Sequence, residues 1–127
     1  MRASNVVVMV SLLSGIAVAS VAEAHHSYSA LFDSSKTVTI SGEVTEFQFQ
    51  NPHGYILVTV TSEAREPVVW EIETTAIGQL IRHGLTPSVL HPGDQISVVG
   101  NRSRDGRRLM RLLTITMPNG ERKEIQK

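Results

Sequence analysis

The sequence predicts a mainly β protein, a small five-stranded OB-like barrel with one short helix between strands three and four. Five segments alternate apolar and polar residues, and a segment of helical spacing separates the third from the fourth. Gly42 interrupts the first segment, where a barrel strand has to bend. An open sheet with one helix and a small sandwich are the alternatives. We prefer the barrel because closure leaves few unpaired strand edges.

The first strand is predicted at residues 37–50 and contains a change of phase. Apolar residues alternate with polar ones as far as Val44, but Phe47 and Phe49 continue with the opposite phase. One extra residue in a strand moves the following side chains to the other face, so the change of phase predicts a bulge. Gly42 precedes it and permits tight curvature.

The second and third strands are predicted at residues 55–62 and 66–73. Residues 55–62 resume the alternation after the turn sequence NPHG. In the third strand, alternation puts Trp70 and Ile72 on one face and Glu73 on the other. We therefore expect Trp70 to face inward.

Residues 74–84 change to the spacing of a helix. Three apolar residues carry this spacing: Ile77, Leu80 and Ile81. Thr74 or Thr75 is expected to cap the free amides at the start, and Gly84 suits the left-handed residue after the last turn. The sequence thus predicts one short helix.

The fourth and fifth strands are predicted at residues 95–101 and 108–117. The dipeptide Asp105-Gly106 between them is typical of a hairpin turn whose two central residues have positive φ. Residues 118–121, PNGE, predict a further turn after the fifth strand.

Residues 1–24 have the layout of a signal peptide. The basic residue Arg2 precedes a long uncharged apolar run, and Ala22 and Ala24 supply the small residues that a signal peptidase requires. We expect cleavage after Ala24, so that residues 25–127 form one exported, periplasmic domain without a stable membrane span. A membrane anchor is the alternative, although spanning takes roughly 20 apolar residues and this run is interrupted by serines and a glycine.

The chain has no cysteine, and its charges are unevenly distributed along the sequence. Without cysteine, neither disulfides nor thiolate metal sites stabilise the domain. Acids dominate residues 25–75 and bases dominate residues 101–127. The basic segment suits phosphates or an anionic surface, but export removes most nucleic-acid partners and interleaved charge is typical of a solvated hairpin. We expect no nucleic-acid partner.

Histidines are the residues with the most specific chemistry. After the expected cleavage, His25 offers a free α-amine and an imidazole, which together can chelate one metal ion. His26 and His53 add further imidazoles, and His53 lies in the loop after the first strand, where OB-folds commonly bind ligands. A nitrogen-rich set without thiolates favours Cu(II), followed by Zn(II) and Ni(II). In its ligands the arrangement is similar to the histidine brace of exported copper proteins.

Other interpretations of these residues stay open. His25 and His26 are also compatible with a solvated chain start, and His53 with a turn. The rival function is a metal-free module that binds an organic ligand or partner protein on the barrel face. Its weaker candidate contacts are aromatic residues that are more often core: Phe47, Phe49 and Trp70.

Two further histidines and the enzymatic motifs add little. His83 is expected at the helix end and His91 in a loop. The sequence contains no cysteine nucleophile, no Gly-x-Ser-x-Gly and no phosphate-binding glycine loop. No catalytic residues are therefore predicted.

Several stretches, in this order, resemble an uncharacterised family of exported bacterial proteins, domain of unknown function 6152. They are HHSYSALFD, NPHG, VVWEIET, IRHGLTP, LHPGDQISVVGN and RDGRR. The resemblance covers nearly the whole chain after residue 24. The resemblance implies an exported bacterial protein without an established activity, and it supplies no mechanism.

Overall fold

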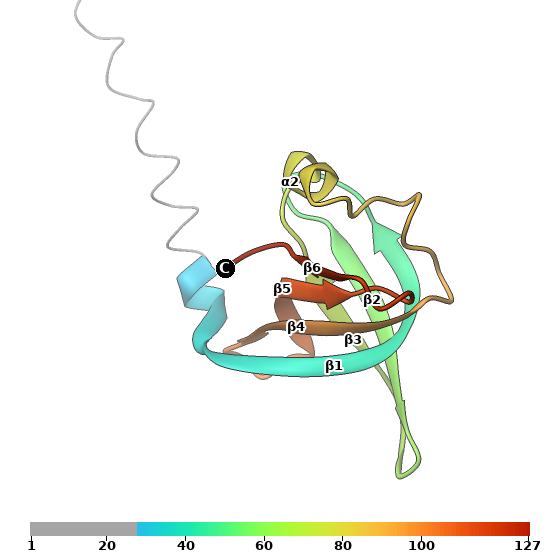
Figure 1. Ribbon diagram of the computed structural model, residues 1–127. Helices are drawn as coiled ribbons and strands as arrows, with labels where there is room; N and C mark the ends of the chain where they lie inside the picture. Colours follow the sequence, from blue (N-terminus) through green and yellow to red (C-terminus); the bar gives the residue numbers. More distant parts are fainter. Residues whose placement is uncertain (1–27) are drawn as a thin grey trace, which may run out of the picture.

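Five strands close into a ring, and a sixth short strand extends the sheet at its edge (Figure 1). The computed structural model describes residues 28–127. The elements follow the order β1 (Phe32–Gln48), β2 (Tyr55–Ser62), β3 (Arg65–Glu73), α2 (Ile77–Arg82), β4 (Gln95–Ser103), β5 (Leu109–Thr116) and β6 (Arg122–Glu124). The strand order is β3-β2-β1-β4-β5-β6, and a parallel β3–β5 pairing closes the ring. The OB-like barrel with its helix between the third and fourth strands is confirmed.

The long strand β1 belongs to both halves of the barrel because it bends. Its first part pairs with β4 and its second part with β2. The register with β2 shifts between Val44 and Glu46, which is the predicted bulge. A Cβ atom on Gly42 would lie 2.2 Å from the backbone oxygen of Thr59, so only glycine permits this approach.

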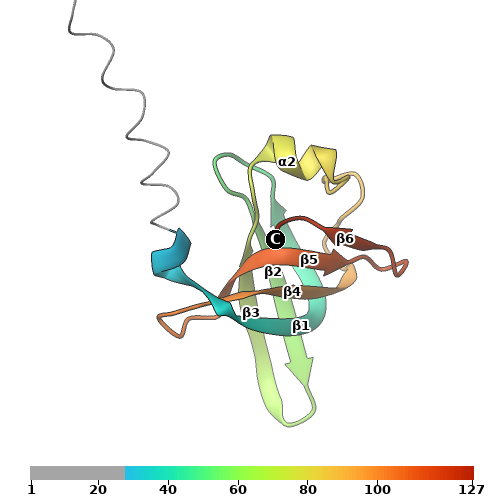
Figure 2. The ribbon, with the colours of Figure 1, turned by 60° about the vertical axis from the view of Figure 1, so that its left-hand side comes forward.

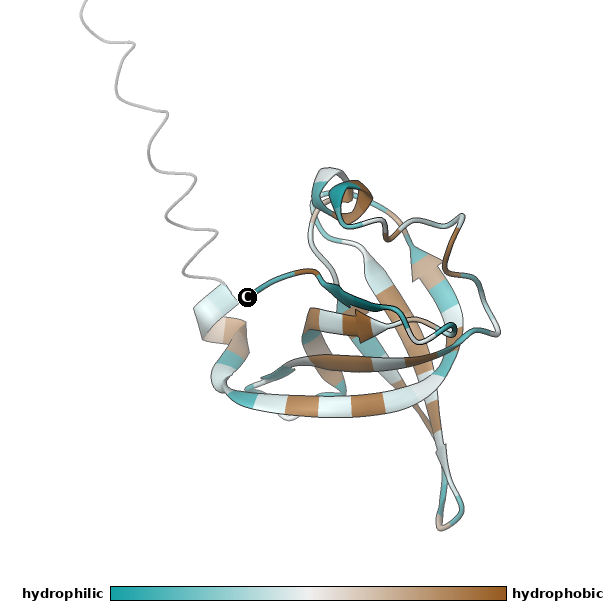
Figure 3. Ribbon diagram, viewed as in Figure 1, coloured by the Kyte–Doolittle hydropathy of each residue, from teal (hydrophilic) through white to brown (hydrophobic). Residues whose placement is uncertain are grey.

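The core lies inside the ring and under the helix. Ile56, Val58, Ile72 and Leu112 are fully buried, in agreement with the alternation of their strands. Figure 3 shows the corresponding alternation of hydrophobic and hydrophilic residues along β1. Figures 1 and 2 both place α2 over one end of the barrel, opposite the tip of the β2–β3 hairpin.

The helix differs from the prediction in two respects. Its cap is not a threonine, because the amide of Ile77 donates to the side-chain oxygen Oδ1 of Asn51 at 2.9 Å and Ala76 occupies the N-cap. Leu80 is buried as expected, but Ile81 is 56% exposed because a helix of six residues covers the barrel with only one side. The positive φ of Gly84 after the last turn is confirmed.

The C-terminal part also differs from the prediction. Leu109 begins β5 only after a five-residue loop, residues 104–108, so the Asp105-Gly106 turn is wider than a two-residue hairpin turn. Asp105 organises this loop by accepting hydrogen bonds from Ser103 Oγ at 2.5 Å and from the amide of Arg107 at 3.0 Å. These hydrogen bonds lower its pKa to about 2. The strand β6, after the predicted PNGE turn, was not expected.

The described part of the chain begins with a helical turn at residues 28–31, which we call the N-terminal turn. The backbone oxygen of Leu31 accepts from the amide of Arg104 at 2.8 Å, and that of Ser29 accepts from Arg104 Nε at 3.1 Å. The predicted signal peptide, residues 1–24, and the histidines His25 and His26 lie outside the described residues. Within residues 28–127, no helix is long and apolar enough to cross a membrane.

Candidate functional site

The loop between β1 and β2 holds His53 in a fixed position at the barrel surface. The amide of Thr74 donates to the backbone oxygen of Gly54 at 2.8 Å, which joins the loop to the end of β3. Gly54 is required here because a Cβ atom would lie 2.3 Å from the backbone oxygen of Gln48. Asn51 and Pro52 are joined by a cis peptide bond, and Asn51 caps α2. The sequence NPHG is thus a structural connection as well as the source of His53.

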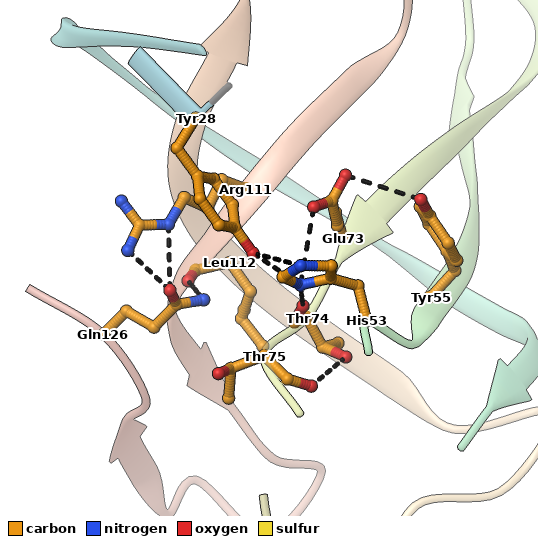
Figure 4. A network of polar contacts seen from close by, with 9 residues as sticks. All are labelled: Tyr28, His53, Tyr55, Glu73, Thr74, Thr75, Arg111, Leu112 and Gln126. Carbon is orange, nitrogen blue, oxygen red and sulfur yellow. Dashed lines mark hydrogen bonds and ion pairs between the residues drawn. The ribbon is translucent and has the colours of Figure 1, made fainter. Parts of the chain in front are cut away.

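The imidazole of His53 lies among oxygen atoms (Figure 4). Its Nδ1 atom is 2.5 Å from the Tyr28 hydroxyl, 3.2 Å from the backbone oxygen of Thr74 and 3.7 Å from Glu73 Oε1. Because a carbonyl oxygen only accepts hydrogen bonds, we assign the proton of the neutral ring to Nδ1. The lone pair then lies on Nε2, which is 3.0 Å from the Tyr28 hydroxyl.

Tyr28 joins the N-terminal turn to this loop and to the end of the chain. Its ring meets the His53 ring edge-on, with the centroids 5.1 Å apart. The guanidinium carbon of Arg111 lies 5.0 Å from the centroid of the Tyr28 ring, a cation–π contact. The Arg111 guanidinium in turn donates to Gln126 Oε1 from Nε at 2.9 Å and from a terminal nitrogen at 2.6 Å. Both ends of the described chain therefore meet beside His53.

Glu73 adds a nearly buried carboxylate to the site. Glu73 is only 8% exposed, and this burial is the main reason that the pKa of its carboxyl group is raised. Three neighbours oppose this shift: His53, Tyr55 and Arg111. Tyr55 donates its hydroxyl to Glu73 Oε2 at 3.5 Å, and burial together with the Glu73 charge raises the pKa of Tyr55. His53 thus has an acidic neighbour on its Nδ1 side.

The structure brings His53 together with two residues that the sequence did not single out, Tyr28 and Glu73. Tyr28 follows the histidine pair by two positions, and this proximity in the sequence could have marked it as a residue of the site. Glu73 had none, because strand alternation placed it outward like its neighbours. Of the three histidines predicted as metal ligands, only His53 is placed, because His25 and His26 lie outside the described residues.

The remaining predicted residues lie elsewhere. Phe47 and Phe49 meet edge-on with their centroids 5.6 Å apart, and both are partly buried against the core. Trp70 is also partly buried against the core, and the guanidinium of Arg102 lies over its ring at 5.4 Å. Their role as ligand contacts stays a prediction. Two histidines occupy the expected places, at the helix end and in a loop: His83 and His91.

The described residues alone do not form a metal site. Within residues 28–127, no group of three or more His, Cys, Asp or Glu side chains comes together. His53 and Glu73 form a pair at 3.7 Å.

Comparison with known proteins identifies a family. A family model described as a family of unknown function, DUF6152, matches residues 13–111. The chain belongs to the DUF6152 family. The matched region of this DUF6152 protein includes His25, His26 and His53.

No curated protein matches the sequence. Among solved structures, the DUF6152 chain is similar to a crystal structure of the mitochondrial single-stranded DNA-binding protein Rim1 from S. cerevisiae. The TM-score is 0.50 at 10% sequence identity, and the match covers 65% of this chain and 92% of the other. At this identity the similarity concerns the fold and agrees with the closed OB-like ring.

Proposed function

We propose that this protein is exported, that its signal peptide is cleaved after Ala24, and that the mature chain binds Cu(II). The ligands are the amine and imidazole of His25, with the imidazoles of His26 and His53. The observation that carries the proposal is the contact between Tyr28 and His53. It supports the proposal because it holds the chain, just after the histidine pair, against the third histidine.

The length of the connecting chain is compatible with this arrangement. An extended chain spans at most about 3.3–3.6 Å per residue, so the Cα atom of His25 lies within roughly 11 Å of the Cα atom of Tyr28. The Tyr28 hydroxyl already touches the His53 ring. Residues 25 and 26 can therefore reach His53 without displacing the N-terminal turn.

The chemistry of His53 also suits a metal ligand. Its Nδ1 proton points toward the Thr74 carbonyl and Glu73, which is the outer contact that orients metal-bound histidines. Nε2 keeps the lone pair. A metal ion bound to Nε2 would take the place of the Tyr28 hydroxyl, which approaches this nitrogen in the structure. A free α-amine titrates near about 8, so the loss of its proton to a metal costs little at neutral pH.

The processing step is tested by intact-mass measurement of protein exported from bacterial cells. We expect a chain that begins at His25, because Ala22 and Ala24 supply the small residues of the cleavage site. A retained apolar segment, or cleavage at another position, would contradict the proposed free amine of His25.

Copper binding is tested by comparing the mature chain with a variant that carries one extra Met before His25. The added residue changes no side chain of the protein, but it separates the amine from the His25 imidazole. We expect Cu(II) affinity, measured by competition with a chelator of known strength, to fall by orders of magnitude. His53→Ala should weaken binding less, and His83→Ala, exposed at the helix end, should leave it unchanged. Equal affinity with and without the extra Met would refute the terminal chelate.

A second candidate function is the binding of a small polar organic molecule without metal. A cleft of about 480 Å³ supports it, because volumes of this size suit small ligands. Five hydroxyl-bearing side chains line the cleft: Ser41, Thr59, Thr61, Ser97 and Thr116. A ligand that binds equally in the presence and absence of a chelator, and is lost in Thr59→Val, would favour this function over copper.

A further inference from the structure

A second site is formed where the start of β1 leaves the sheet. The pairing of β1 with β4 passes from Phe32↔Ser103 directly to Thr37↔Asn101. Residues 33–36 therefore have only Arg102 opposite them, and they bulge away from β4. The bulge and the loop after β4 enclose a cleft of about 650 Å³, within the range of small-molecule sites.

The charge of this cleft is predominantly positive. Three cations and one carboxylate line it: Lys36, Arg102, Arg104 and Asp33. The two ion pairs of Asp33 are long, at 3.9 Å to Lys36 and 3.7 Å to Arg104. The carboxylate instead accepts the Ser35 hydroxyl at 2.6 Å and the Ser35 amide at 3.1 Å, which lowers the pKa of Asp33. The cleft thus keeps an excess of two positive charges that its own acid does not satisfy.

Arg102 is the best-positioned of these cations. Its guanidinium lies over the Trp70 ring at 5.4 Å, and a terminal nitrogen donates to the backbone oxygen of Gly106 at 3.3 Å. No carboxylate lies within ion-pair distance of Arg102 among residues 28–127. A guanidinium held in this way loses little side-chain entropy when it binds an anion.

Arg104 is fixed from the opposite side. Its Nε donates to the backbone oxygen of Ser29, and its backbone amide donates to that of Leu31. Lys36, in contrast, is 75% exposed and lies 3.9 Å from Asp33. Two held guanidinium groups and one exposed ammonium group line the same cleft.

The geometry points to a binding site for a dianionic oxyanion group, a phosphate or sulfate, in the cleft between residues 33–38 and 102–106. Two charges on the ligand match the excess charge of the lining, and guanidinium groups match the oxygen geometry of phosphate and sulfate. The site uses neither His53 nor the histidine pair. It is therefore independent of the proposed copper function.

The experiment is an NMR titration of the mature chain with inorganic phosphate, at a pH where phosphate is a dianion. Sodium chloride keeps the ionic strength constant, because weak surface charge effects depend on salt. We expect saturable shifts confined to the amides of residues 33–38 and 102–106. Lys36→Gln and Arg102→Gln should each weaken binding roughly tenfold, through loss of a charge-assisted hydrogen bond. Arg82→Gln, an exposed cation on α2, is the control and should change nothing.

Parallel titrations with sulfate and glycerol phosphate distinguish the sources of the group. Equal affinities identify a site for the free anion, and tighter binding of the ester identifies a site for a small phosphorylated molecule. Shifts that do not saturate, or that Lys36→Gln leaves unchanged, would overturn the proposal. Because Lys36 is exposed, we expect Lys36→Gln to fold like the natural chain, so a change in its binding reports on the site. Preference for an oligonucleotide by orders of magnitude would also overturn it, in favour of a nucleic-acid surface.

Discussion

Tyr28→Phe removes one hydroxyl from the contact between the N-terminal turn and His53. The ring is retained, and with it the Phe32 contact at 6.2 Å and the cation–π contact with Arg111 at 5.0 Å. The variant therefore isolates the hydrogen bond to the His53 ring, 2.5 Å from the hydroxyl to Nδ1. We expect the N-terminal turn to detach more often from the barrel.

The size of the effect follows from the exposure of the pair. A hydrogen bond between partly buried neutral groups contributes about 0.5–1.5 kcal/mol, and we take about 1 kcal/mol here. The population of the detached turn then rises roughly fivefold, since about 1.4 kcal/mol corresponds to a factor of ten. If the turn opens only together with the whole domain, the same loss lowers Tm by about 4–8 °C. Local opening gives a smaller change in Tm.

Hydrogen exchange at one amide reports the detachment directly. The Arg104 amide donates to the backbone oxygen of Leu31 in the N-terminal turn at 2.8 Å, so it exchanges when the turn leaves. We expect its exchange to accelerate about fivefold in Tyr28→Phe. The Leu85 amide, which donates to Leu80 at 2.9 Å at the far end of α2, is the internal control.

Tyr28→Ala supplies the matched comparison. It removes the ring contacts as well as the hydroxyl, so Arg104 exchange should accelerate more than in Tyr28→Phe. Unchanged Arg104 exchange in both variants would refute the reasoning, because the turn would then be held without Tyr28. Equal acceleration of the Leu85 amide would also refute it, since the effect would be global.

Three further predictions test the fold and the charged loop. Gly42→Ala should destabilise the domain by at least about 3 kcal/mol in denaturant unfolding, because its Cβ atom would lie 2.2 Å from the backbone oxygen of Thr59. Gly78→Ala is the control: a Cβ atom there meets nothing within 4 Å, so the variant should be about 0.5–1 kcal/mol more stable. Asp105→Asn should lower Tm at neutral pH, because the lowered pKa of Asp105 means that its ionised form stabilises the folded state. The difference in Tm from the natural chain should shrink as the pH falls from 3.8, the pKa in the unfolded chain, through about 2, the pKa in the folded chain. Trp70→Ala should cost less than the about 3–5 kcal/mol of a fully buried aromatic side chain, since Trp70 is partly buried; a loss at the upper end would contradict its partial exposure.

Local patterns were sufficient to predict the barrel. Alternation located the five strands of the ring, and the change of phase after Val44 located the bulge. The sequence did not reveal the cap of α2, because its donor and acceptor, Ile77 and Asn51, come from different segments. It also missed β6, a strand of only three residues that has no alternation to detect.

The candidate site was only partly predictable because its members meet through tertiary structure. His53 was found from its chemistry and from its place after the first strand. Tyr28 reaches it because the turn before β1 is fixed by Arg104, a residue of the loop after β4. Gln126 holds Arg111 over the Tyr28 ring from the other end of the chain. No spacing of residues in the sequence predicts these tertiary contacts.

Glu73 links the electrostatics of the site to its proposed function. Alternation places it on the same face of β3 as Val69, which is 51% exposed, yet Glu73 is only 8% exposed. Three polar or charged side chains lower its pKa against the effect of burial: His53, Tyr55 and Arg111. A carboxylate in such surroundings is stabilised by positive charge nearby, and it increases the electron-donating power of an imidazole that it faces. A cation bound at Nε2 of His53 would supply that charge through the ring, so Glu73→Gln should weaken Cu(II) binding while leaving every proposed ligand in place.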